Sequence, residues 1–232
     1  NKLSSFNGNV YPVIFDKVQS IKTLGNDPGS QPVQFSSQQN IIFKGKSKVV
    51  NGEFSYTFVV PKDINYQFGP GKISYYADDS NKDGSGAETT IVVGGASSNP
   101  LNDKTGPLIK AYLNDEKFVN TGITNEEPVL VVKLFDSSGI NTVGTGIGHD
   151  LTATLDNDNS RYFILNDYYE AESDSYQRGT ARFQLPKLTE GNHVLTIKAW
   201  DVVNNSSDYR LEFTVVKDGE LKIGQLYNYP NP

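Results

Sequence analysis

The sequence contains no cysteine. This absence excludes disulfide bonds, thiolate metal sites and a cysteine nucleophile within these 232 residues, and it leaves the redox compartment undetermined. Runs of Lys and Arg are also missing, because 21 basic residues face 27 acidic ones and the net charge is -6. The chain therefore lacks the positive surface that nucleic acid or anionic lipid attracts, and we expect no nucleic-acid partner.

Long apolar runs are absent as well. No run approaches the ~20 residues that a membrane-spanning helix needs, so we expect no direct membrane insertion by this chain. The sequence begins at Asn1 without a methionine or a leader, and it stops on a proline soon after the strand-like LKIGQL. We therefore expect a piece of a longer protein.

Short runs with β-strand patterning fill the chain, and no segment shows sustained helical periodicity. The clearest is GNHVLTIKAW, in which Leu195, Ile197 and Ala199 alternate with a mixed face, while residues 128–135 are apolar on both faces like a central strand. Regular spacing without helices predicts an all-β chain of two tandem immunoglobulin-like antiparallel β-sandwich domains. The runs cover residues 10–15, 18–24, 40–43, 52–60, 72–77, 89–93, 107–113, 128–135, 151–155, 161–165, 180–185, 194–200 and 210–216.

The two halves share an internal repeat of glycine, strand, Pro-Lys, connection, glycine and a second strand that ends near an acid. We interpret each copy as a hairpin, because proline ends one strand by removing a donor and glycine relieves the backbone where the next begins. The landmarks are Gly52, Pro61, Lys62, Gly71 and Asp78 in the first half, and Gly179, Pro186, Lys187, Gly191 and Asp201 in the second.

The small-residue stretch GGASSNP separates the two halves. We predict a first β-sandwich domain over residues 1–96, a linker over 97–106 and a second immunoglobulin-like domain over 101–217. Residues 218–232 follow this second domain.

The two histidines are the first candidates for catalysis. His149 lies in the glycine-rich GTGIGHD beside Asp150, but the stretch lacks the preceding strand and following helix of a phosphate-binding loop, which favours a tight turn. His193 begins a strand that Asp201 ends, and about eight steps of ~3.3 Å are too far for a dyad. No serine stands in a nucleophile-elbow sequence, so we assign no catalytic residue. We expect the turn at residues 201–205 to face a partner.

Acidic loops make calcium the more plausible ligand chemistry. Asp79, Asn81 and Asp83 in DSNKDG fit the first half of an EF-hand loop, yet position twelve is threonine rather than glutamate and flanking helices are missing. Asp156 and Asp158 in DNDN join two strands. These five residues are weak metal candidates. Hairpin turns use the same residue types, so solvated turns without a cofactor are favoured and calcium is the alternative.

Exposed aromatic residues offer a third kind of site, because sugar rings stack on planar side chains. Tyr168, Tyr169, Tyr176 and Trp200 are the candidates. Trp200 lies on a strand that should pack against a partner sheet, and tyrosine is common in sandwiches, so packing roles are favoured.

The segment FKGKSKVVNGEFSYTFVVPKDINYQFGPGKISYYA resembles the region that follows the peptidase domain in PorU-like sortases, gingipain-type cysteine peptidases of the type IX secretion system. DKTGPLIKAYLND, LFDSSGINTVGTGIGHDLTATLD and GTARFQLPKLTEGNHVLTIKAWDVVNNSS are similar to the next domain of that family, in the same order. NYPNP resembles the start of a type IX C-terminal domain, which implies that residues 218–232 begin a truncated sorting-type domain.

The resemblance implies an accessory role. The family's peptidase domain uses a histidine and a cysteine, and since neither His149 nor His193 lies in a matching motif, no catalytic residue carries over and this fragment is not expected to be an enzyme. The full-length parent would be a cysteine endopeptidase on the extracellular face of the outer membrane of a Gram-negative bacterium. The implied partners are its own peptidase domain, secreted cargo and other attachment-complex proteins. The alternative is a carbohydrate- or calcium-binding surface adhesion module.

Overall fold

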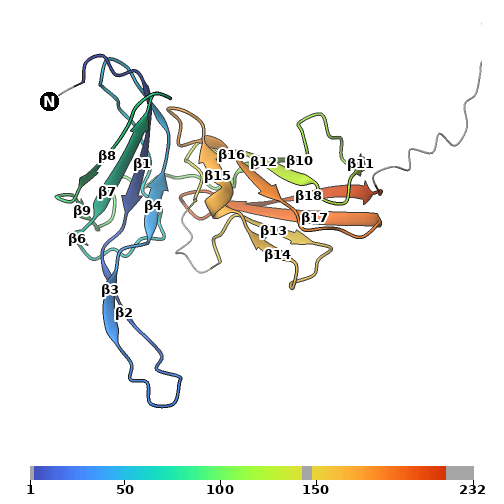
Figure 1. Cartoon of the computed structure of the whole chain (residues 1–232), viewed down its shortest axis with the longest axis horizontal. Helices are drawn as coiled ribbons and strands as arrows, with labels where there is room; N and C mark the ends of the chain where they lie inside the picture. Colours follow the sequence, from blue (N-terminus) through green and yellow to red (C-terminus); the bar gives the residue numbers. More distant parts are fainter. Residues whose placement is uncertain (1–2, 143–147, 218–232) are drawn as a thin grey trace, which may run out of the picture.

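The computed structural model describes residues 3–142 and 148–217, so the predictions for Gly144 to Ile147 and for residues 218–232 lie outside the described residues. Strands β1 to β9 form one group, here called the first domain, and β10 to β18 form the second domain beside it (Figure 1). The described strands of the two groups share no sheet. The predicted linker at residues 97–106 falls between β9 and β10, and its bounds stay a prediction.

The elements have the following bounds. The first domain contains β1 (Gly8–Phe15), β2 (Gln19–Lys22), β3 (Gln34–Ser37), β4 (Ile41–Lys44), β5 (Ser47–Val49), β6 (Gly69–Pro70), β7 (Lys72–Asp78), β8 (Asp83–Glu88) and β9 (Val92–Val93). The second contains β10 (Leu108–Leu113), β11 (Ile123–Thr124), β12 (Val129–Phe135), β13 (Thr152–Leu155), β14 (Tyr162–Ile164), η1 (Asn166–Tyr168), β15 (Tyr169–Ala171), β16 (Arg178–Gln184), β17 (Gly191–Trp200) and β18 (Ser206–Val215). Within the described ranges, no helix has the length and apolarity to cross a membrane.

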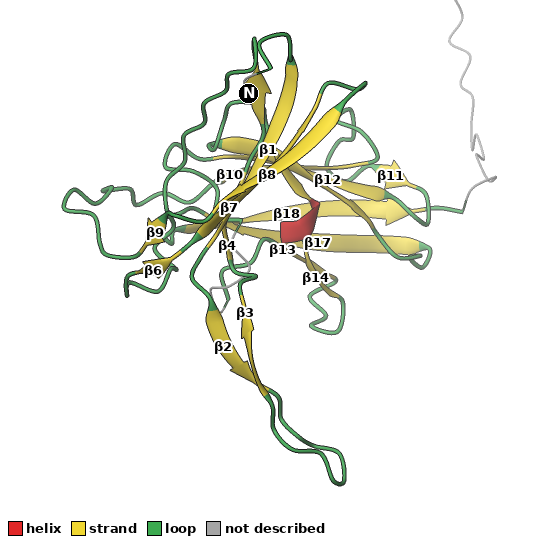
Figure 2. Cartoon of the chain, turned by 60° about the vertical axis from the view of Figure 1, so that its left-hand side comes forward, coloured by secondary structure: helices red, strands yellow, loops and turns green. Residues whose placement is uncertain are grey.

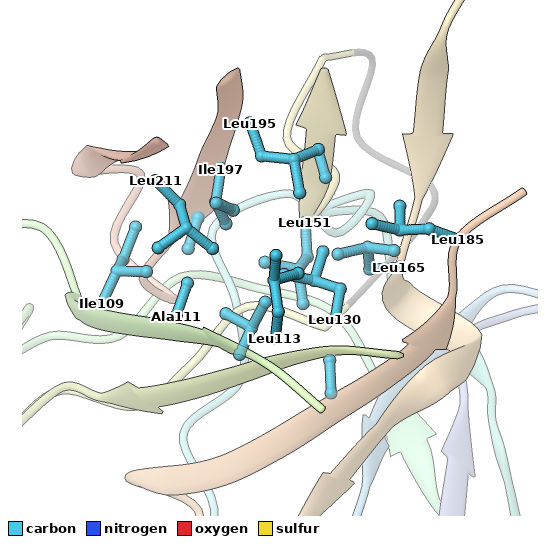
Figure 3. Close-up of a cluster of buried hydrophobic side chains, with 14 of the residues drawn as sticks. Ile109, Ala111, Leu113, Leu130, Leu151, Leu165, Leu185, Leu195, Ile197 and Leu211 are labelled. Atoms are coloured by element: carbon cyan, nitrogen blue, oxygen red, sulfur yellow. The ribbon is translucent and has the colours of Figure 1, made fainter. Parts of the chain in front are cut away.

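The second domain is a sandwich of two sheets. One sheet has the order β10-β12-β16-β15 and the other β11-β18-β17-β13-β14, and all neighbours are antiparallel except the β11–β18 pair. Leu195, Ile197 and Ala199 of β17 are fully buried, as the alternation predicts. They meet aliphatic side chains of the facing sheet in one continuous core (Figure 3). The predicted all-β class with antiparallel sandwiches is confirmed.

The first domain is built on the sheet β4-β1-β7-β8, with β5 also paired to β1. Its inner face carries Val10, Ile14 and, across from Ile14, Phe43. From this sheet the β2–β3 hairpin projects as a separate two-stranded arm (Figures 1 and 2). All four β2 residues are exposed, so the arm has no core of its own.

Two predictions about the first domain are wrong. Residues 52–60 are not a strand, because no other strand pairs with them, although their side chains keep the alternation that suggested one. Strand β8, with the sequence DGSGAE, was not predicted, because Gly84 and Gly86 have poor strand propensity and tertiary pairing with β7 overrides it.

The predicted hairpins of the repeat are also wrong. In the second domain, β16 and β17 lie in different sheets, so Pro186 stands in a crossover between layers rather than in a hairpin turn. In the first domain, residues 54–60 likewise do not pair with β7. In both domains, the repeat therefore marks the point where the chain crosses from one layer of the sandwich to the other. Residues 54–60 correspond to β16, and β7 corresponds to β17.

Candidate functional site

A polar cluster joins the two domains. It consists of Asp63, Asn141, His149 and Asn204, and we call it the junction cluster. Asp63 belongs to the loop after residues 54–60, and its Oδ2 lies 2.7 Å from His149 Nδ1 and accepts a 3.0 Å bond from Asn141 Nδ2. Asn204 Nδ2 donates to the other oxygen, Oδ1, over 2.9 Å. One buried carboxylate of the first domain is thus held by three side chains of the second.

The turn at residues 201–205 positions one side of this cluster. Asp201 is fully buried, and its Oδ1 accepts bonds from the amides of Val203 at 2.9 Å and Asn205 at 2.7 Å, which closes the turn after β17. The exposed loop of the first domain then binds it, because the Lys62 amide donates to the Val202 carbonyl over 2.9 Å. The turn that was expected to face a partner faces the protein's own first domain.

The position of His149 is fixed by contacts with residues distant in sequence and not by its neighbour Asp150. Its ring packs on Trp200, with 4.2 Å between the centroids, and its bonded carboxylate is Asp63. The glycine-rich stretch before His149 gave no signal for this pairing, because the two partners are 86 positions apart. The imidazole and carboxylate form a domain contact, and the sequence motif alone missed it.

A second contact between the domains is centred on Asp174. Its Oδ1 accepts bonds from Ser47 Oγ at 2.6 Å and from the Lys48 amide at 3.0 Å, and its own amide donates to the Lys46 carbonyl. The hydroxyl of Ser47 and the amide of Lys48 lower the pKa of Asp174, so the carboxylate is ionised in the contact. The domains are therefore joined reciprocally, by one carboxylate from each.

Three further carboxylates gather beneath the junction: Asp103 before β10, Asp136 after β12 and Asp201 after β17. We call them the acidic trio, because one oxygen from each lies within 4.8 Å of the others. Asp136 is only 4% exposed, and its Oδ1 accepts bonds from the Ser138 and Gly139 amides.

The electrostatics of the trio follow from burial and crowding. Burial raises the pKa of Asp136 to about 6, and the charges of Asp201 and Asp103 add to the rise. Asp103 moves the other way, because the Ser138 hydroxyl and the Thr105 amide and hydroxyl lower its pKa to about 2. The three oxygens match the hard ligands that a divalent cation such as calcium prefers.

Comparisons with known proteins give a likeness among solved structures. No family model matches the chain, and a search of curated proteins finds no match either. Among solved structures, the chain is similar to the dimeric latent PorU from Porphyromonas gingivalis, with 31% identity over 93% of this chain and a TM-score of 0.50. The chain resembles a part of PorU. It covers only 20% of the length of that PorU chain.

The PorU likeness agrees with the coarser part of the expectation from sequence, that this chain is a PorU-related β-rich region. It does not test the predicted metal residues. Asp79 Oδ1 accepts bonds from the Asn81 and Lys82 amides, which lower its pKa, and Asp83 Oδ2 accepts one from the Tyr76 hydroxyl. These residues build the β7–β8 turn and do not join the acidic trio.

The second predicted acidic loop is also used locally. Asp156 Oδ2 lies 2.8 Å from His193 Nδ1 and 3.1 Å from Arg161 Nη1, and Asp158 accepts bonds from the Ser160 amide and hydroxyl. His193 is buried at the start of β17, as its position in the strand pattern predicts. Calcium at these loops stays a prediction, and the acidic trio was missed because its members are far apart in sequence.

The four candidate aromatic residues do not form one platform. Tyr168 is exposed, but its ring meets Phe183 edge-on at 4.9 Å. Tyr169 is buried in the core, Tyr176 packs beside Gly139, and Trp200 lies under His149. Packing therefore accounts for most of this aromatic surface.

The substitution Asp63→Ala should loosen the domain junction, because three donors lose their shared acceptor. We expect the free energy of unfolding to fall by about 1–3 kcal/mol, since buried donors left without an acceptor keep their desolvation cost. Small-angle X-ray scattering should show a broader distance distribution. Asp27→Ala, in the exposed β2–β3 arm, is the control. Identical scattering and stability for both variants would show that the junction cluster does not hold the domains.

Proposed function

We propose that this chain is a non-catalytic accessory region of a PorU-like cysteine peptidase at the cell surface. The observation that carries the proposal is the 31% identity to PorU over 93% of this chain, in a match that covers 20% of PorU. A region of that size leaves room for the catalytic domain elsewhere in the parent. The absence of cysteine is consistent with catalysis by another domain.

The junction geometry supports a positioning role. The Asp63 and Asp174 contacts restrict the motion of the two sandwiches relative to each other, as a spacer between a peptidase domain and its cargo would require. In this proposal the region contacts its own peptidase domain, secreted cargo or other attachment-complex proteins. The parent would remove C-terminal sorting signals from cargo on the extracellular face of the outer membrane.

Deletion of residues 1–217 from the full-length parent should impair cargo processing. The expected result is secreted cargo that keeps its C-terminal sorting signal, measured by immunoblotting and mass spectrometry of surface fractions. Deletion of residues 25–32 alone, the tip of the exposed β2–β3 arm, is the control for a shortened chain that keeps both domains. Normal cargo processing in the variant that lacks residues 1–217, with the parent protein present at the wild-type level, would refute the positioning role.

A calcium-dependent surface module is the second candidate function. The acidic trio favours it, because Asp136 is a buried residue and one of its carboxylate oxygens lies within 4.8 Å of oxygens of Asp103 and Asp201. Calcium bound there would offset two of the three crowded negative charges. Millimolar calcium should then raise the melting temperature of the wild type over that in EDTA, and Asp136→Asn should remove most of the rise. No rise in the wild type would exclude this candidate.

A further inference from the structure

Residues 54–60 have the geometry of a β-strand although they belong to no sheet. The rings of Phe54, Tyr56 and Phe58 stack in a row, with centroids 6.4 Å and 6.3 Å apart. This spacing matches the ~6.6 Å rise of two residues in a strand, so alternate side chains point to one face. That face lies on the sheet of the first domain, where Phe58 stacks on Phe43 at 4.6 Å and the Tyr56 and Tyr75 hydroxyls are 3.1 Å apart.

No strand among the described residues pairs with either backbone edge of this segment. Of its amide and carbonyl groups, only the Ser55 carbonyl lies within hydrogen-bond distance of a described donor, the Ser47 hydroxyl, whose one proton it shares with Asp174. Ser55 and Thr57, which alternate with the rings, are exposed. A row of free backbone donors and acceptors in strand geometry is a template for another strand.

Comparison with the second copy of the internal repeat shows which neighbouring strands residues 54–60 lack. β16 occupies the equivalent position in the second domain and is paired on both edges, with β12 on one side and β15 on the other. In the first domain, the described residues supply neither neighbour for 54–60. Among the described residues, the second layer of this sandwich is therefore reduced to the extended segment 54–60 and the two-residue β6–β9 ladder.

The described residues cover the inner face of the first sheet only in part. An apolar cavity of ≈ 520 Å³ opens beside the segment, and its lining includes Ile14, Ile42, Phe58, Val60, Ile73 and Ile91. Further along, Gly84 and Gly86 lie opposite Ala77 and Tyr75 in the register, so they share the inner face. A Cβ built on either glycine would meet no atom within 4 Å.

We propose that residues 54–60 accept a β-strand from another polypeptide, with apolar side chains at alternate positions. The strand pairs with the free backbone of the segment and places its apolar side chains in the cavity over Ile14 and Ile73. The free backbone edge selects an extended peptide over a helix, and the aliphatic lining selects apolar side chains over charged ones. This inference uses only the first domain and does not depend on a peptidase parent.

The test uses the whole 232-residue chain and a synthetic probe. The probe is a peptide of about nine residues, Thr-Val-Lys-Val-Thr-Ile-Lys-Val-Thr, which is an ordinary strand length. The control peptide has proline in place of its central threonine. We expect the amides of residues 54–60 to exchange with deuterium rapidly in the free chain and to be protected by the probe but not by the control peptide.

Thr57→Pro and Thr57→Ala form a matched pair of variants. Thr57 is exposed and its amide donates to no described group, so both variants should fold. Proline removes one donor from the edge, and probe binding should weaken about tenfold or more in Thr57→Pro while Thr57→Ala binds as the wild type does.

Three results would overturn the proposal. One is protection of residues 54–60 in the free, dilute chain. Another is that the alternating peptide and the proline-containing peptide protect the amides of residues 54–60 equally, or that neither peptide protects them. The third is protection that rises with the chain's own concentration and leaves no site for the probe, which would assign the edge to a second copy of this chain.

Discussion

Leu195→Ala should lower the free energy of unfolding of the second domain by about 3–4 kcal/mol. Leu195 is fully buried in β17, directly opposite Leu155 on one neighbouring strand and Leu211 on the other. Truncation removes contacts to both and leaves a cavity that close-packed sheets cannot collapse to fill. Such a loss is a large fraction of the stability of an ordinary domain.

Urea denaturation followed by tryptophan fluorescence measures this loss selectively. The chain has one tryptophan, Trp200, and it lies at the end of β17, so its signal reports on the second domain. Thr196→Ala, the adjacent residue on the other face of the same strand, is the control and should change stability by less than about 1 kcal/mol. Equal losses for the two variants would contradict the assignment of Leu195 to the centre of the core.

Asp136→Asn should stabilise the protein in EDTA above about pH 6, by about 3 kcal/mol. The folded-state pKa of Asp136 is about 6, against an ordinary value of 3.8, so between these values the folded chain binds more protons than the unfolded one. Stability therefore falls as the pH rises through this window, and the full cost is present above it. The amide keeps an oxygen for the Ser138 and Gly139 amides and removes the charge beside Asp103 and Asp201.

The pH dependence separates this effect from a general gain in stability. The advantage of Asp136→Asn over the wild type should shrink as the pH falls and approach zero near pH 3, below the ordinary pKa of 3.8, where the wild-type carboxyl is protonated in both states. Asp158→Asn is the control, because hydrogen bonds from Ser160 lower the pKa of that exposed carboxyl and its removal should bring no gain at neutral pH. A stabilisation by Asp136→Asn that is constant from pH 4 to pH 8 would contradict the electrostatic explanation.

The local sequence correctly predicted those strands in which an alternating side-chain pattern coincides with pairing to a neighbouring strand. β17 is the best example, since the alternation of Leu195, Ile197 and Ala199 is the alternation of its burial. Residues 54–60 show the limit of this reasoning, because Phe54, Tyr56 and Phe58 alternate equally well and adopt strand spacing. A side-chain pattern records which face packs, and it contains no information on whether a neighbouring strand is present.

The functional clusters were beyond such reasoning for a related reason. Asp63 and His149 meet across two domains, and the acidic trio combines a linker residue with the ends of β12 and β17. The acidic residues that stand close together in sequence have other roles, since Asp158 stabilises its own turn and Asp156 joins that turn to the start of β17. Acidic residues that are close in sequence lie in turns of this chain. The junction cluster and the acidic trio instead form where loops and strand ends distant in sequence come together.

The reciprocal contacts of Asp63 and Asp174 also decide how the molecule can bend. A body fastened at two points can swing only about the line that passes through them, so twisting and sideways motion are suppressed while one arc stays soft. The two points are the carboxylates that join the 61–66 loop to the second domain and β5 to the β15–β16 turn. Any domain or partner attached to one sandwich is therefore expected to move relative to the other sandwich by rotation about this single axis.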